Sequence, residues 1–218
     1  MKGAGIAGVP GFTPGATLSI LNPIMAILKI ARMGHPVLAR KADPVPDPTH
    51  PEIRRLVRDM IDTMRDADGT GLAAPQVHVP LRVVVFFVEG ERAARESNRA
   101  DEASPDEASP DEEGGVPLTV MVNPVIEPLG PEQALGWEAC LSVPELAGRV
   151  PRFTRIRYRF QDLEGRQHER LAEDFHARVV QHECDHLDGK LYPQRMTDIR
   201  TLVFSSEMRH QGEAEVRD

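Results

Sequence analysis

The amino-acid sequence predicts an α+β fold, and three observations lead to this class. The chain has 218 residues, of which 40% are hydrophobic, enough to bury one core. Segments with helical periodicity and segments with strand-like composition both occur along it. They interleave without the regular strand-helix-strand rhythm of a parallel sheet. We therefore expect one domain with antiparallel strands and few helices.

The N-terminal residues 1–24 are expected to form a flexible extension of the domain. They are rich in glycine and proline, carry Lys2 as their only charge, and lack the compact order of a signal peptide. A targeting peptide is the alternative interpretation. A more protein-like stretch begins at Met25, so we place a single domain at residues 25–200, followed by a C-terminal tail, 201–218, that can be helical.

The first predicted elements of the domain are a helix and a strand. Between Asp47 and Asp66, apolar residues recur every three or four positions, as on one face of an amphipathic helix; they are Ile53, Leu56, Val57, Met60, Ile61 and Met64. Leu81 to Val88 is β-branched and aromatic, which predicts a buried strand.

An acidic segment, residues 89–115, follows this strand. It repeats Asp-Glu-Ala-Ser-Pro twice between Asp101 and Pro110 and has no large apolar residue to anchor it. Such a sequence cannot offset the entropy cost of ordering itself, so we expect a disordered insertion between two strands. A tract that binds a partner is the alternative.

The second half of the domain predicts further strands and one more helix. A strand over 118–126 is interrupted at Asn123-Pro124, and a second strand covers 155–161. A hairpin turn follows at 162–165. From Asp174 to Leu187, the spacing of apolar residues and histidines predicts a helix.

Composition excludes several function classes. The net charge of -8 argues against direct DNA binding, which depends on clustered Lys and Arg. No apolar run approaches the roughly 20 residues that span a bilayer, so no membrane role is expected. Two cysteines in motif-like stretches favour a reducing compartment, and the cytoplasm is the expected location.

The second predicted helix carries a metal-binding motif, His182-Glu183-Cys184-Asp185-His186. Two histidines four residues apart share one helix face and can bind one metal ion, and the carboxylate between them can carry a proton. A catalytic site needs a third protein ligand, and Cys140 is the candidate. Cys184 lies roughly 200° around the helix from His182 and should point into packing.

Two further motifs complete the pattern. Gly-x-Gly-Leu-Ala-Ala-Pro-Gln ends at Gln76, and Glu-x-Cys-Leu-Ser surrounds Cys140. In this order, with the histidine motif, they resemble the three signature motifs of peptide deformylase. The resemblance runs from about Ile27 to Met196, apart from the acidic insert. It departs at Ala139, where the family motif usually has glycine.

The resemblance implies a fold with antiparallel sheets packed around the central metal-binding helix. It also implies the activity: removal of the formyl group from the N-terminal formylmethionine of new polypeptides, with release of formate. Nascent N-formylmethionyl peptides are then the substrates, and a transient association with the ribosome is implied. The implied cofactor is one divalent metal ion, with Fe²⁺ favoured and Zn²⁺ the alternative.

Site roles follow from the same resemblance. The implied metal ligands are Cys140, His182 and His186, and a water bound to the metal is the implied nucleophile. Glu183 is the expected general acid and base. The Gln76 side chain and the Leu141 backbone N–H are the expected donors to the developing oxyanion.

Supporting residues are also expected around the site. The substrate would contact Thr70, Gly71, Phe175 and Val179, although a core role for Phe175 and Val179 is the alternative. The resemblance also implies an ion pair between Asp185 and Arg152 behind the ligands, with Glu138 in the same outer layer of the site.

Two rival functions remain open at this point. An endopeptidase of the His-Glu-x-x-His type would use the same helix, but its third ligand would lie downstream, whereas Cys140 lies upstream. A non-catalytic binding module with a structural metal would need four protein ligands, and only three are evident.

Overall fold

The computed structural model describes residues 26–90 and 115–210. The predicted extension 1–24, residues 91–114 of the acidic insert and residues 211–218 of the tail lie outside the described residues. Within the described ranges, no helix has both the length and the apolar character needed to cross a membrane.

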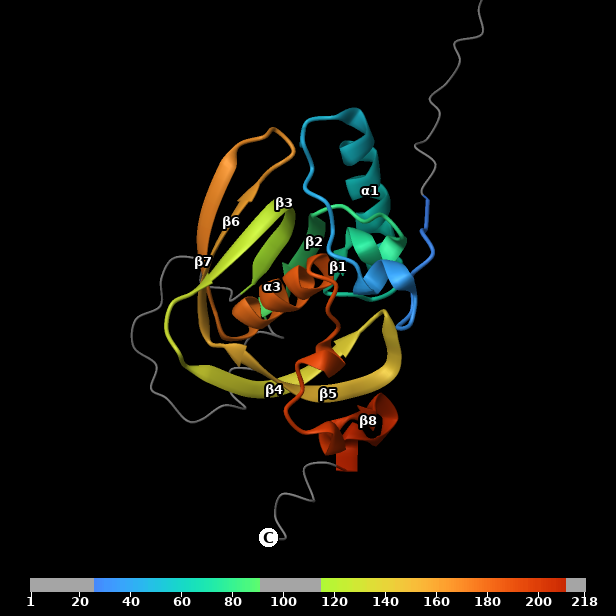
Figure 1. The fold of residues 1–218 in the computed structure, drawn as a ribbon, viewed down its shortest axis with the longest axis vertical. Coiled ribbons are helices and arrows are strands. Elements are labelled where there is room, and N and C mark those ends of the chain that lie inside the picture. Colours follow the sequence, from blue (N-terminus) through green and yellow to red (C-terminus); the bar gives the residue numbers. More distant parts are fainter. Residues whose placement is uncertain (1–25, 91–114, 211–218) are drawn as a thin grey trace, which may run out of the picture.

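In the part of the chain that the structure describes, two antiparallel sheets form the framework, in agreement with the predicted α+β class (Figure 1). The larger sheet has the order β1-β2-β3-β6-β7, with strands Gly71–Ala73, Val83–Val88, Val116–Pro128, Arg155–Gln161 and Gln167–Glu173. The smaller sheet has the order β4-β5-β8, with strands Gln133–Cys140, Val143–Phe153 and Val203–Phe204.

Within the described ranges, two α-helices accompany the sheets, α1 (Pro51–Asp66) and α3 (Asp174–Leu187). Short 3-10 helices fill the connections, at Pro36–Ala39, Ala74–Val77, Tyr192–Gln194, Ile199–Thr201 and Ser205–His210. The predicted helix over 174–187 is therefore confirmed at both ends. The predicted strands at 155–161 and 81–88 are also present, although the second begins at Val83.

Helix α1 begins at Pro51, four residues later than the periodicity predicts. The preceding residues include Pro48, and a residue before proline is driven away from helical geometry. His50 has extended backbone angles, and its side chain accepts a hydrogen bond from the Glu52 backbone N–H. Proline in the first turn costs nothing because its missing N–H would have no partner there.

The predicted interruption at Asn123-Pro124 takes the form of a β-bulge. Strand β3 runs through both residues, and its register against β6 shifts between Val122 and Val125. Asn123 has a positive φ of 53°, and its side chain bonds both the N–H and the C=O of Val45. The Asn123 side chain thus pairs the backbone polar groups of Val45, in the loop before α1, at the point where the bulge bends β3.

The larger sheet is covered on both faces by helices. Helix α1 packs through Val57, Met60 and Met64 against one face, which presents Val83 and Val85. Helix α3 packs through Ala177, Val180 and Leu187 against the other face. Figure 1 shows α3 lying between the larger sheet and the β4–β5 hairpin. The helix with the metal motif is therefore central, and both of its sides are buried.

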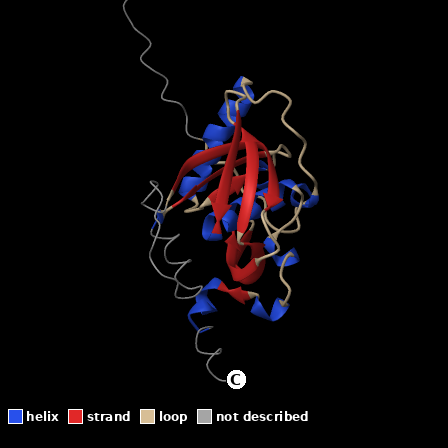
Figure 2. Cartoon of the chain, turned by 90° about the vertical axis from the view of Figure 1, so that its left-hand side faces the viewer, coloured by secondary structure: helices blue, strands red, loops and turns tan. Residues whose placement is uncertain are grey.

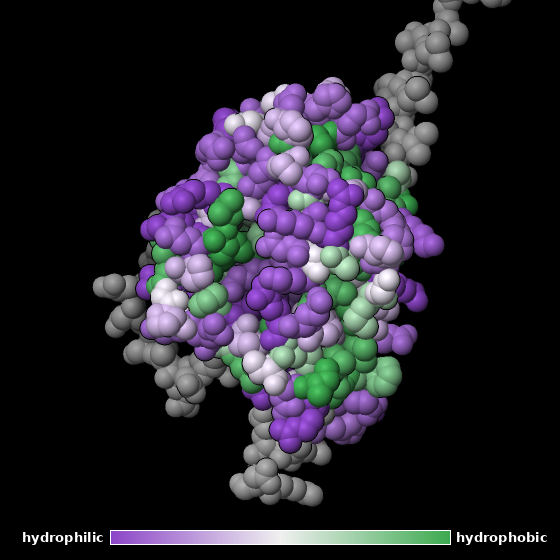
Figure 3. Space-filling view, viewed as in Figure 1, coloured by the Kyte–Doolittle hydropathy of each residue, from purple (hydrophilic) through white to green (hydrophobic). Residues whose placement is uncertain are grey.

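The C-terminal part of the described chain joins the smaller sheet. Strand β8 pairs with β5 through Phe204 and Val203, at the end of the molecule farthest from α1 (Figures 1 and 2). Hydrophobic side chains gather on the surface near β8 in Figure 3, and Ile199 and Phe204 are 65% and 58% exposed. The residue that follows β8, Ser205, lines a cavity that reaches α3, so the apolar surface near β8 lies beside this cavity.

Candidate metal centre and active site

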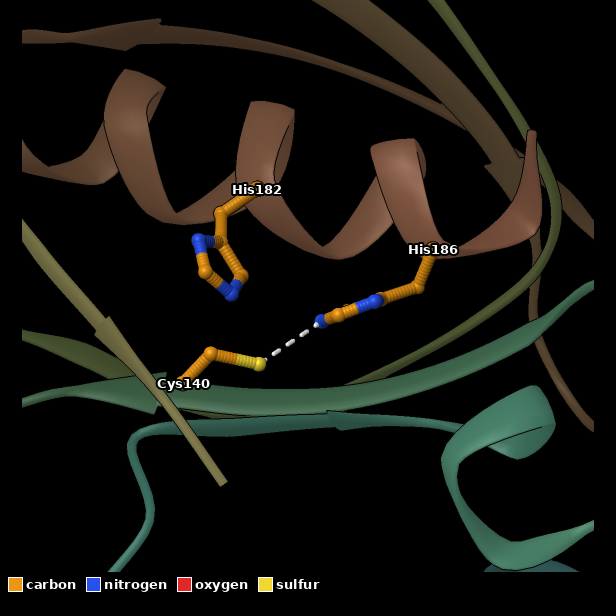
Figure 4. Close-up of side chains that lie close together, drawn as sticks. All are labelled: Cys140, His182 and His186. Atoms are coloured by element: carbon orange, nitrogen blue, oxygen red, sulfur yellow. Dashed lines mark hydrogen bonds between the residues drawn. The ribbon is translucent and has the colours of Figure 1, made fainter. Parts of the chain in front are cut away.

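Three predicted ligands converge between α3 and β4. The ligand atoms of Cys140, His182 and His186 all lie within 4.8 Å of one another. Figure 4 shows the two rings projecting from successive turns of α3 toward the sulfur from β4. Cys140 Sγ lies 3.4 Å from His186 Nε2. A thiolate and two imidazoles form a donor set that suits zinc and other transition-metal ions.

Local backbone geometry places these side chains. The i, i+4 spacing on α3 puts His182 and His186 on one face of the helix. On β4, the pairing with β5 shifts in register between Ala139 and Cys140, where the hairpin closes opposite Val143. A register shift of this kind changes the direction in which the next side chain points. Here it accompanies the turn of the Cys140 sulfur toward α3.

A buried carboxylate orients the first histidine. Glu138 Oε2 lies 2.8 Å from His182 Nδ1, which leaves Nε2 directed at the ligand cluster. Arg152 donates to both oxygens of Glu138, at 2.8 and 3.0 Å. Burial opposes ionisation of Glu138, but hydrogen bonds from Arg152 and His182 hold its pKa well below the usual range. A carboxylate behind a histidine is the usual outer partner of a metal ligand.

Asp185 lies on the other side of the same network. Arg152 donates to its Oδ2 at 2.6 Å, and Arg195 donates to both of its oxygens, at 3.0 and 2.6 Å. Asp185 and Arg152 are each 5% exposed. The structure therefore brings together the predicted residues Asp185, Arg152 and Glu138 as one buried chain of ion pairs behind the ligands.

Glu183 faces the cavity from the edge of the ligand cluster. It is 5% exposed, and its Oε2 has no hydrogen-bond partner among the described residues. A Cβ atom at Gly71 would lie 2.3 Å from Glu183 Oε1, so only glycine leaves room for this carboxylate. Burial raises the pKa of Glu183 to about 7. A divalent cation at the neighbouring ligands would favour the carboxylate and lower this value.

Gln76 is fixed beside the sulfur. Its Oε1 accepts from the Ala73 backbone N–H at 2.8 Å, which directs Nε2 toward Cys140 Sγ at 3.6 Å and Ser142 Oγ at 3.2 Å. The Ser142 backbone N–H also approaches the sulfur, at 3.4 Å. Ser142 lies in the quoted cysteine motif, but no contact with Gln76 was predicted for it.

A cavity of about 390 Å³ opens in front of these groups. All four predicted substrate-contacting residues line it, namely Thr70, Gly71, Phe175 and Val179. Leu141 lines it as well. The cavity also includes Gly69 and Arg178, which the sequence did not indicate as site residues.

The second cysteine lies away from the ligands, as the helical geometry predicts. Cys184 is 7% exposed and packs in the apolar cluster between α3 and the larger sheet. Burial raises the pKa of its thiol well above the usual value. Because thiolates bind metals and thiols do not, Cys184 is unsuited to the site.

The electrostatics of the ligand cluster fit a divalent cation. Burial lowers the pKa of His186 well below its usual value, so its ring is neutral, which is the form that binds metals. Burial also opposes a charge on His182, but hydrogen bonds to Cys140 and Glu138 raise its pKa well above the usual value. This part of the site therefore attracts positive charge. The unpartnered Glu183 Oε2 adds a buried acceptor beside it.

Comparison with known proteins agrees with this geometry. The family model described as polypeptide deformylase matches residues 27–201. Peptide deformylase 1 of Bordetella pertussis is 50% identical over 182 residues, which cover 84% of this chain and 93% of the relative.

Solved structures give the same result. The Met-Ala-Ser-bound class I type b peptide deformylase of Acinetobacter baumannii superposes with a TM-score of 0.65 and 31% identity, over 79% of this chain and 100% of the other. The peptide deformylase of Ehrlichia chaffeensis gives a TM-score of 0.67 and 28% identity, over 88% of this chain and 99% of the other. The chain therefore belongs to the polypeptide deformylase family of metal-dependent hydrolases.

Proposed function

We propose that this protein removes the formyl group from the N-terminal formylmethionine of new polypeptides and releases formate. The observation that supports this most directly is the convergence of Cys140, His182 and His186 beside Glu183 at one cavity. Three protein ligands leave a coordination position for water, as in catalytic and not in structural metal sites. The family match and the 50% identity to a peptide deformylase support the same activity.

The proposed mechanism uses Glu183 twice. When held by Cys140, His182 and His186, a divalent cation supplies Lewis acidity and lowers the pKa of water toward about 7. Glu183 accepts the proton of the attacking water, which adds to the formyl carbon. The same carboxyl then returns the proton to the leaving amine.

Two donors are proposed to hold the oxygen that becomes negative during attack. One is the Gln76 side-chain amide, whose orientation is fixed by the Ala73 N–H. The other is the Leu141 backbone N–H, in the turn that follows β4. Loss of one such donor typically costs a hundredfold or more in rate, on the order of 3 kcal/mol.

The methionine side chain is proposed to occupy the part of the cavity bordered by Phe175 and Val179. Both residues line the cavity, Phe175 two turns and Val179 one turn before His182. Thr70 and Gly71 are proposed to contact the peptide backbone, because glycine permits a close approach. Ala139 also lines this cavity, where its methyl group narrows the space beside the substrate backbone.

The assay that tests this function measures formate release from an N-formylmethionyl tripeptide together with the metal content of the protein. We expect the wild type to bind one divalent ion and release formate, and Cys140→Ala to lose both properties. A metal-loaded wild type that releases no formate would instead favour a non-catalytic binding module. Cleavage of internal peptide bonds would favour the endopeptidase reading.

Fe²⁺ is the proposed native metal, with Zn²⁺ as the alternative. A Cys-His-His donor set accepts both ions, so the proposal follows the family resemblance. Anaerobic reconstitution decides between them: we expect the iron form to release formate faster than the zinc form. Equal rates would contradict the preference for iron.

The remaining proposals concern the setting of the enzyme. We propose a cytoplasmic location, nascent formylmethionyl chains as substrates and a transient association with the ribosome. Residues 25–200 are proposed as the catalytic domain, which agrees with the family match over 27–201. Co-sedimentation of the full-length protein with ribosomes tests the association.

A further inference from the structure

Arg178 is a buried guanidinium in the wall of the active-site cavity. It lies on α3 one turn before His182 and is 9% exposed. It lines the same cavity as Glu183. The mechanism proposed above gives it no role. Burying a charged group of this size is costly unless its partners are fixed, so its contacts are informative.

These contacts join α3 to the β4–β5 hairpin and to Glu138. Arg178 Nη1 donates to Glu138 Oε1 at 2.9 Å and to the Val150 carbonyl at 2.8 Å. Its Nη2 donates to the Ala134 carbonyl at 2.8 Å. Glu138 receives its other guanidinium contacts from Arg152, which is shared with Asp185. Two buried carboxylates are thus matched by two buried guanidinium groups.

Gly136 is required by the position of this guanidinium. A Cβ atom at residue 136 would lie 2.7 Å from both Cζ and Nη2 of Arg178. Any side chain there would push the guanidinium away from the strand. Glycine at position 136, two residues before Glu138, therefore leaves the space on β4 that the guanidinium of Arg178 occupies.

We propose that Arg178 is a positioning residue for metal binding. It holds Glu138 so that Oε2 meets His182 Nδ1 at 2.8 Å, and the ring of His182 then presents Nε2 to the ligand cluster. The inference rests on the proposed function only in taking Cys140, His182 and His186 as the metal ligands. Groups that orient a ligand histidine typically contribute about 10- to 100-fold in metal affinity.

A purely structural role is the competing explanation, since Arg178 also attaches α3 to strand carbonyls. The chain offers a matched control for that role. Gln181 lies on α3, is 8% exposed, and bonds the Phe153 backbone N–H and C=O at 3.1 and 2.8 Å. It attaches the helix to β5 as Arg178 does, but it is not hydrogen-bonded to Glu138.

The test compares Co²⁺ binding by full-length wild type, Arg178→Met, Arg178→Lys and Gln181→Met. Affinity is measured by competition with a chelator, and the visible absorption of bound Co²⁺ reports the geometry of its ligands. We expect Arg178→Met to bind Co²⁺ about tenfold more weakly with an altered spectrum. Gln181→Met should stay within about twofold of the wild type even where its melting temperature falls. Arg178→Lys, which keeps the charge, should lie between.

Equal Co²⁺ affinity and equal spectra in Arg178→Met and Gln181→Met would overturn the proposal. If Arg178→Met does not fold, Arg178→Lys decides: weaker binding than Gln181→Met supports the proposal, and wild-type binding refutes it. The measurement uses no formylated substrate. A wild type that binds Co²⁺ but releases no formate would therefore contradict the proposed function and leave this inference standing.

Discussion

Helix α3 packs one side against the larger sheet and the other against the β4–β5 hairpin, and the two sides differ in chemistry. The sheet side presents Ala177, Val180, Cys184 and Leu187, all buried in one apolar cluster. The hairpin side presents ionisable groups instead, namely the buried Arg178, Asp185 and His186 and the half-buried His182. The same helix thus faces a hydrocarbon-like interior and a network of charges.

The difference separates stability from chemistry. Apolar burial on the sheet side stabilises the fold by roughly 25 cal/mol per Å². On the hairpin side, the attraction between Glu138 and its arginine partners is offset by the cost of removing all of them from water. We therefore expect substitutions on the sheet side to change mainly the free energy of unfolding, and those on the hairpin side to change mainly metal binding and turnover.

The largest expected effect concerns Glu183, at the border between the two sides. Glu183→Gln keeps the size of the side chain but cannot accept a proton, so we expect turnover to fall by about 10²- to 10⁴-fold. Metal content should stay near that of the wild type, because Glu183 is not among the three ligands. Formate release and metal analysis of the same sample measure both. Glu164→Gln, at an exposed site, is the control. Near-normal turnover in Glu183→Gln would remove Glu183 from the mechanism.

On the sheet side, Leu187→Ala should lower the free energy of unfolding by about 2–5 kcal/mol. Leu187 is fully buried, and the smaller side chain leaves a cavity. Urea titration measures the loss, and the metal content of the folded protein should not change. Leu171, which is 58% exposed, provides the control, since Leu171→Ala should stay within about 0.5 kcal/mol. Equal losses of unfolding free energy in Leu187→Ala and Leu171→Ala would contradict the stabilising role assigned to the sheet side of α3.

The two sides of α3 also differ in how far the sequence predicts them. Helical periodicity and the spacing of His182 and His186 predict the helix and its ligand face, because both depend on residues close in sequence. The β-branched run that ends at Val88 predicts β2 for the same reason. Such local patterns predict most of the larger sheet.

The hairpin was not predicted from the sequence alone. Gln133–Cys140 and Val143–Phe153 contain glycine, proline and charged residues, which are usually signs of exposed turns. Glu138 and Arg152 are buried there only because they pair with each other and with α3. The role of Arg178 could not be predicted for the same reason, since its partners Glu138 and Val150 lie about 30 to 40 positions away in the sequence. Contacts over such separations depend on the folded chain and leave no local pattern.

On the hairpin side, Glu138→Gln should weaken metal binding by about 10- to 100-fold. The amide can still accept from His182 Nδ1, but it loses the charge that Arg152 and Arg178 surround. Chelator competition measures the affinity. Glu132→Gln, at an exposed site just before β4, should bind metal as the wild type does. An unchanged affinity in Glu138→Gln would show that the charge network does not support the ligands.

The smallest expected effect concerns His176, a titratable group among the sheet-facing contacts of α3. Its Nε2 lies 3.0 Å from the Tyr158 hydroxyl, and its ring lies beside Phe86. Burial, and to a smaller extent the charge of Arg170, lower the pKa of His176 to about 4. Below about pH 6.5, His176 is protonated in the unfolded chain but stays neutral in the folded chain. The free energy of unfolding therefore falls as the pH falls toward 4.

Between pH 7 and pH 5, His176 should therefore cost the wild type about 1–2 kcal/mol of unfolding free energy. His176→Phe should lack this contribution, whatever its stability at pH 7, because phenylalanine does not titrate. Urea titrations at both pH values measure the difference, and His210→Gln, at an exposed site, should keep the wild-type slope. Parallel slopes in wild type and His176→Phe would mean that the sheet side accepts a charged ring. The two sides of α3 would then differ because only the hairpin side offers partners to a buried charge, and not because the sheet side excludes charge.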